Sequence, residues 1–221
     1  MSALASASAN LFRRLVFVFV LALWLPHAIA ADGAAIYAAQ CASCHGAQAL
    51  GNAAVFSPRL AGQNAAYLHE QLNAYQQGQR GSHADDTQGQ AMRTLARDLS
   101  AEQMAAVSIY LAALPDSYPG SERRSDPSTK KIVGASLYAS DCAICHGQYG
   151  QGAESIFVPN LRILSSWYLD AQLLAYANGW RGGDGASTRA KNMRSMSGQV
   201  PDRDQRAAIV EHLTGPQSQG R

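Results

Sequence analysis

Two short stretches determine how this 221-residue chain folds: CASCH at residues 41–45 and CAICH at residues 142–146. Both have the form C-x-x-C-H, which is typical of covalent haem attachment. Two thiols about one helical turn apart can each form a thioether with a haem vinyl group, and the adjacent imidazole can then bind the iron. The candidate attachment residues are Cys41, Cys44, Cys142 and Cys145, and the candidate proximal ligands are His45 and His146.

The sequence around the two motifs is also repeated. A shift of 101 residues aligns residues 33–99 with a second copy without a gap. A repeat of this length indicates a duplicated domain, because solenoid units are only about 20–50 residues long. Residues 115–131 hold three prolines together with serines and charges, a composition typical of a surface linker. We therefore expect one domain at 31–114, a linker at 115–131 and a second domain at 132–215.

Both copies are predicted to be helical. Asn64 is a candidate N-cap for a helix that ends at Gly78, and Ser165 and Gly179 are the equivalent residues in the second copy. Ser100 opens a later helix with the pattern of a capping box. No β-branched residues alternate with polar ones over a sustained run, so strands are not expected. The predicted fold class is all-α.

Each haem iron also needs a second axial ligand, and the repeat favours methionine. Met92 and Met193 are equivalent, and each lies 47 residues after its motif histidine. Met196 competes with Met193, but its counterpart in the first copy is a leucine. No cysteine is spare, and none of the remaining histidines after residue 30 is repeated. We therefore expect Met92 to bind the first iron and Met193 the second.

Two further pairs of repeated residues are candidates for a supporting role. Pro58 and Pro159 each follow the motif histidine by 13 residues, and a carbonyl there could accept the imidazole Nδ1–H. A simple loop turn explains the prolines equally well. Arg80 and Arg181 could pair with haem propionates. Solvent-facing arginines are the competing explanation.

The N-terminus has the features of a secretory signal peptide. Arg13 and Arg14 precede an apolar run at residues 15–25, and Pro26 ends that run. Eleven apolar residues are too few to span a bilayer, which takes about 20. Small residues then predict cleavage after Ala30, with an uncleaved anchor as the alternative. The protein is therefore expected in the periplasm.

Composition and charge exclude several classes of protein. Hydrophobic residues make up 47% and charged residues 15%, so the chain is not globally disordered. The formal net charge of +2 gives no basic footprint for nucleic acid. Residues 31–120 hold four bases and seven acids, whereas residues 121–221 hold twelve bases and nine acids. The opposite charges predict different partners for the two domains, with solubility alone as the alternative explanation.

The duplicated motifs, the Pro-x-Leu segments, the YLxxQLxAYxxGxR stretches at 67–80 and 168–181 and the late methionines together resemble the di-haem cytochrome c4 family. The resemblance implies two tandem cytochrome c-type domains, each wrapped around one covalently attached haem c. It implies a periplasmic carrier, often held near the membrane, that takes electrons from a quinol-oxidising complex and gives them to a terminal oxidase.

Two other functions remain open. The chain could be the haem electron-acceptor subunit of a periplasmic dehydrogenase, because a subunit and a free carrier share the same haem chemistry. It could also be a di-haem redox enzyme, such as a peroxidase or a thiosulfate dehydrogenase. Six-coordinate His/Met irons leave no open position for a peroxide, and the thiosulfate enzyme would by resemblance use a cysteine ligand that this chain lacks. We therefore expect no catalytic residue and no small-molecule substrate.

Overall fold

A computed structural model describes residues 31–116, 129–200 and 202–214. The expected signal peptide with its cleavage site after Ala30, and most of the expected linker, lie outside the described residues. Within the described ranges, none of the helices has the length and apolar character needed to cross a bilayer.

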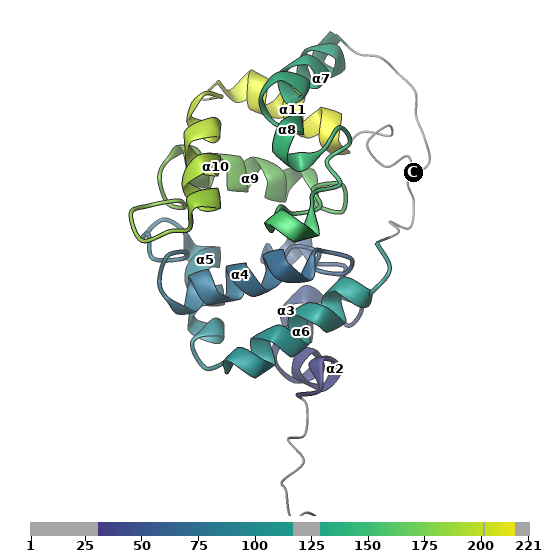
Figure 1. Cartoon of the computed structure of the whole chain (residues 1–221), viewed down its shortest axis with the longest axis vertical. Helices are drawn as coiled ribbons and strands as arrows, with labels where there is room; N and C mark the ends of the chain where they lie inside the picture. Colours follow the sequence, from purple (N-terminus) through teal and green to yellow (C-terminus); the bar gives the residue numbers. More distant parts are fainter. Residues whose placement is uncertain (1–30, 117–128, 201, 215–221) are drawn as a thin grey trace, which may run out of the picture. The chain divides into compact units, whose positions relative to one another are not determined.

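The described residues form helices and loops, in the same order in each half of the chain (Figure 1). The N-terminal half (residues 31–116) contains α2 (Gly33–Ile36), the π-helical turn η1 (Tyr37–Cys41), α3 (Ala42–His45), η2 (Ala53–Val55), α4 (Ala65–Gln76), α5 (Thr87–Ala96) and α6 (Ala101–Ala113). The C-terminal half (residues 129–214) contains α7 (Thr129–Asp141), α8 (Ala143–His146), η3 (Glu154–Ile156), α9 (Ser166–Ala177), α10 (Thr188–Gly198) and α11 (Arg203–Thr214). Extended pairing in these ranges is limited to isolated bridges, so the all-α prediction is confirmed.

The predicted helix starts are correct, but their capping differs from the prediction. Ser100 forms the complete capping box at the start of α6. Asn64 and Ser165 precede α4 and α9, yet neither side chain caps its helix. The Asn64 amide instead donates to the Val158 carbonyl at 2.5 Å, in the other half of the molecule. The Asn64 side chain therefore bonds across the contact between the halves instead of capping α4, as the local sequence pattern predicts.

The first and last helices of each half pack closely against each other, α2 against α6 and α7 against α11. This packing requires a glycine at the point of contact. A Cβ atom on Gly33 would lie 2.2 Å from the Ala106 carbonyl oxygen, and one on Gly134 would lie 2.0 Å from that of Ala208. Each half has its own apolar core, including Tyr37, Leu68, Val107 and Leu111 in the first and Tyr138, Leu169, Ile209 and Leu213 in the second.

The remaining helices position the predicted site residues. The short turns η1, α3 and α8 carry the C-x-x-C-H motifs, whereas α5 and α10 carry the candidate methionines. α5 packs against α4, and α10 packs against α9. α4 and α9 face each other across the contact between the two halves (Figure 1), where side chains from each half bond to the other. The site therefore extends from the motifs to this contact.

Candidate haem sites

Each C-x-x-C-H motif forms a short helical turn that places one cysteine inside and one at the surface. Cys44 and Cys145 are exposed, and Cys41 and Cys142 are partly buried. None of the four takes part in a disulfide. Burial, with a smaller contribution from nearby charges, raises the pKa of the Cys41 thiol and of the Cys142 thiol to about 11 each. Each motif therefore offers two unpaired thiols, one of them at the protein surface.

The burial of both motif histidines favours the neutral form of their imidazoles. The Nδ1 atom of His45 lies 2.8 Å from the carbonyl oxygen of Pro58, so this ring nitrogen can donate to it. The Nδ1 atom of His146 is buried without a hydrogen-bond partner. Burial lowers the pKa of His146 to about 4, with the Pro159 carbonyl opposing the shift, and burial lowers the pKa of His45 as well. A neutral imidazole with a buried Nδ1 leaves Nε2 as the metal-binding atom.

One buried tyrosine closes the loop behind each histidine. The Tyr37 hydroxyl donates to the carbonyl of Gly46, and the Tyr138 hydroxyl donates to that of Gly147 at 2.7 Å. Both side chains are almost fully buried. Burial raises the pKa of Tyr37 to about 12. The sequence analysis assigned these residues no role, although their exact repetition after 101 positions was a visible signal.

A cavity in the C-terminal half brings the predicted residues together. Cys142, Cys145 and His146 line it, as do Met193 and its rival Met196. Leucine, isoleucine and valine side chains form the body of the cavity, and its polar end includes Tyr168, Gln172 and Arg181. A haem has an apolar macrocycle and two carboxylate-bearing propionates, so the lining and the donor set fit this group. In the N-terminal half, Met92 lies partly buried on α5, at the position that corresponds to Met193.

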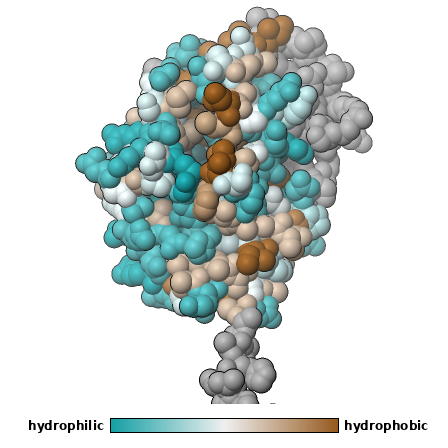
Figure 2. Space-filling view, viewed as in Figure 1, coloured by the Kyte–Doolittle hydropathy of each residue, from teal (hydrophilic) through white to brown (hydrophobic). Residues whose placement is uncertain are grey.

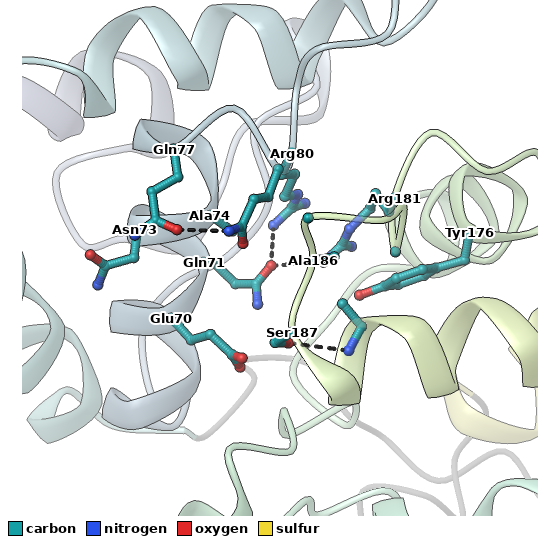
Figure 3. A pocket seen from close by; sticks show the side chains of 14 residues that line it. Glu70, Gln71, Asn73, Ala74, Gln77, Arg80, Tyr176, Arg181, Ala186 and Ser187 are labelled. Atoms are coloured by element: carbon teal, nitrogen blue, oxygen red, sulfur yellow. Dashed lines mark hydrogen bonds between the residues drawn. The ribbon is translucent and has the colours of Figure 1, made fainter.

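The polar end of this cavity meets a cluster of four buried or partly buried side chains from both halves, three of which, Gln71, Arg80 and Arg181, are drawn in Figure 3. Arg80 donates to Gln71 of its own half and to Gln172 of the other half, at 3.0 Å each. Arg181 donates to Gln172 of its own half and, at 2.7 Å, to Gln71 of the other half. Each glutamine oxygen therefore accepts from both arginines.

This cluster holds two positive charges with no carboxylate partner among the described residues. Each guanidinium lies over a tyrosine ring of its own half, Arg80 at 4.4 Å from Tyr75 and Arg181 at 4.2 Å from Tyr176. Arg80 also donates to the Tyr168 hydroxyl at 3.0 Å, while its Nε is buried without a partner. The two arginines also line a separate cavity of about 300 Å³. Buried guanidinium groups are normally neutralised, so the cluster is suited to anionic groups.

The contact between the halves also depends on residues that the sequence analysis did not identify. Gln63 bonds to the backbone of Asn160 through both of its amide atoms. Glu70 forms an ion pair with Arg189 at 2.8 Å. Aromatic contacts join His83 to Trp180 and Phe56 to Trp167. Gln63, Glu70, His83, Trp167, Trp180 and Arg189 are not repeated at the 101-residue offset, so the sequence offered no signal for them.

Comparisons with known proteins agree with this geometry. The cytochrome c family matches residues 30–115 and again residues 133–215. The chain is 35% identical to the thiosulfate dehydrogenase electron acceptor of Stutzerimonas stutzeri (strain A1501) over 200 residues, which covers 83% of this chain and 86% of the relative.

Two solved structures are also similar. The thiosulfate dehydrogenase of Marichromatium purpuratum, in its as-isolated form, is 30% identical with a TM-score of 0.61. The match covers 82% of this chain but only 39% of that one. Reduced recombinant cytochrome c4 from Pseudomonas stutzeri has a TM-score of 0.65 at 24% identity, over 83% of this chain and 96% of the other, and shows the shared fold.

Two tandem family matches, each containing one C-x-x-C-H motif, indicate two covalently bound haem c groups, attached through Cys41 and Cys44 and through Cys142 and Cys145. The relatives are electron-transfer cytochromes or electron acceptors, and the predicted resemblance is confirmed. The function of the chain is therefore electron transfer. The chain belongs to the cytochrome c family, as a member with two tandem cytochrome c domains.

Proposed function

We propose that this protein is the electron acceptor of a periplasmic thiosulfate dehydrogenase. The observation that carries the proposal is the 35% identity, over most of both chains, to a protein with that role. The match to one part of a solved thiosulfate dehydrogenase chain supports it, because the dehydrogenase includes a region similar to most of this protein. The sequence left three functions open: a free carrier, the electron-acceptor subunit of a dehydrogenase and a di-haem enzyme. This proposal is the second of them.

In this function, each half of the chain holds one haem. Residues 31–114 form the first haem domain and residues 132–215 the second. His45 and Met92 would hold the first haem iron, and His146 and Met193 would hold the second. When bound, the haem supplies one-electron iron chemistry, and methionine ligation raises its potential. The geometry around His45 and the cavity lining at His146 and Met193 support these roles.

The residues around the haems orient and neutralise the groups that they contact. The Pro58 carbonyl would fix the ring of His45 through Nδ1. The Pro159 carbonyl would take the same role for His146, whose buried Nδ1 has no hydrogen-bond partner in the structure. Arg80 and Arg181 bind the haem propionates, which supply the negative charge that their buried cluster lacks. The apolar lining of the cavity keeps water from the iron.

The proposal is tested by mixing the oxidised di-haem protein with purified bacterial thiosulfate dehydrogenase and thiosulfate. We expect both haems to become reduced, as followed by their visible absorption, and no reduction when the dehydrogenase is omitted. Reduction by thiosulfate alone would make the chain itself an enzyme, and no reduction in the complete mixture would overturn the proposal. The competing function, a carrier from a quinol-oxidising complex to a terminal oxidase, predicts reduction by that complex instead.

A further inference from the structure

We propose that the electron donor docks on the C-terminal half, against an apolar patch formed by Ile144, Tyr149 and Ile156 and a basic rim formed by α10. The inference rests on the proposed function, because it names the dehydrogenase as the occupant. It goes further by stating which of the two haem domains receives the electron and which chemistry the docking surface of the dehydrogenase has.

The patch surrounds a point where the haem reaches the surface. Cys145 is exposed, so a haem joined to it by a thioether has its edge near solvent there. Ile144 lies beside this cysteine and is 89% exposed, and Tyr149 and Ile156 are 47% and 49% exposed. Figure 2 shows apolar residues over α8 and η3 on one face of the molecule. Because electrons cross between proteins at such an edge, a redox partner is the natural occupant of this patch.

The first domain differs at two of the three equivalent positions, since Val55, which is 51% exposed, corresponds to Ile156. Ser43 takes the place of Ile144, and Gln48 takes the place of Tyr149, and both side chains are exposed. Hydration does not stabilise the apolar side chain of an exposed isoleucine in an attachment motif. Contiguous exposed apolar surface marks interaction sites. The two haem edges are therefore chemically distinct, although they come from the same duplicated unit.

The charges around the second haem indicate which charges the partner carries at the rim of its docking surface. α10 carries the exposed bases Lys191 and Arg194, together with Arg189, which pairs with Glu70, and it has no acidic residue. It lines the same cavity as Cys145, and Arg189 lies 4.4 Å from the Phe157 ring, next to the patch. In contrast, α5 in the first half carries one base. The matching partner surface has an apolar centre around its own redox group and acidic residues at its rim.

The experiment measures the second-order rate constant for reduction of the oxidised protein by thiosulfate dehydrogenase with excess thiosulfate. The variant Ile144→Ser gives the second motif the residue of the first, and we expect a rate constant about tenfold lower, since burial of an isoleucine at an interface strongly favours association. The matched control is Ile109→Ser, which removes an isoleucine that is 65% exposed on α6. This control and Ser43→Ile should leave the rate constant within about twofold of the unaltered protein.

A charge reversal tests the rim. Lys191→Glu should lower the rate constant at low salt, and the difference should shrink at ionic strengths above about 0.15 M. Reduction of every variant by ascorbate, a small reductant, should be unchanged, which shows that the haems are intact. Normal reduction of Ile144→Ser by the dehydrogenase, or equal slowing by Ile109→Ser, would overturn the docking site alone. If the unaltered protein is not reduced by the dehydrogenase at all, the proposed function fails and this inference fails with it.

Discussion

The contact between the halves depends on one buried side chain whose loss should be measurable. Gln63 is only 2% exposed. Its amide nitrogen donates to the Asn160 carbonyl at 3.0 Å, and its amide oxygen accepts from the Asn160 N–H at 2.7 Å. The same oxygen accepts from the backbone N–H of Asn64 at 2.9 Å. Gln63 therefore satisfies both backbone groups of one buried residue in the other half.

Gln63→Ala leaves the N–H and the carbonyl of Asn160 buried without partners. Each unsatisfied group costs about 1–3 kcal/mol, so the free energy of unfolding should fall by about 2–6 kcal/mol. Gln63→Ala also leaves a cavity, and Gln63→Leu separates the loss of hydrogen bonds from the effect of that cavity. Leucine is the residue at the equivalent position 164, and it fills most of the space without forming a hydrogen bond. It should therefore also destabilise the protein, by an amount that reflects the hydrogen bonds rather than a cavity.

The measurement is urea unfolding of the di-haem protein at constant pH, followed both by helical circular dichroism and by haem absorption. A matched control is Gln88→Ala, which changes an exposed glutamine on α5 and should alter the free energy by less than about 0.5 kcal/mol. If the halves are coupled through Gln63, its replacement should also separate their unfolding into two transitions. A change below 0.5 kcal/mol for both Gln63 variants would refute the argument that this contact joins the halves.

Three further predictions concern the haems and the charges. Acid–acetone extraction should leave the colour on the polypeptide, and the denatured mass should show two haem additions; extractable haem or a single addition would contradict the attachment. Met92→Ala and Met193→Ala should each remove about half of the near-infrared sulfur-to-iron band and lower one potential, whereas Met196→Leu should leave both unchanged. The opposite outcome for Met193 and Met196 would mean that the repeat alignment assigns the wrong ligand. Residues 31–120 carry a net charge of −3 and residues 121–221 carry +3. Reduction by strongly acidic or strongly basic donor proteins should therefore slow as ionic strength rises. Rates that do not depend on salt would show that the charges have no steering role.

The sequence was sufficient for the local features of the site. The spacing within C-x-x-C-H fixes where the thiols and the imidazole lie on a short helical turn, so no tertiary information was needed. The 101-residue repeat selected Met193, which lines a cavity with His146, and Pro58, whose carbonyl lies against His45. Met196 lines the same cavity, so the choice of Met193 as the iron ligand stays a prediction. The residues that the repeat selects are those expected to contact the haem, and the two copies carry the same constraint.

The contact between the halves could not be predicted in the same way. A periodic pattern shows which face of α4 is apolar, but it does not show that Asn64 and Gln63 will bond to the other half instead of their own helix. Such bonds depend on how two folded units meet, and no rule of local sequence contains that information. The capping prediction for Asn64 was wrong for this physical reason.

The duplication explains both the repeated and the unrepeated residues of this contact. Two related surfaces that meet about a local twofold relation place each residue near its own copy, so Arg80 and Arg181 share the oxygens of Gln71 and Gln172. Repeated residues are therefore found where both halves make the same contacts, either with a haem or with each other. Residues that differ between the copies break this symmetry. Ile144 against Ser43 is such a difference, and it allows two otherwise equivalent haems to face different partners.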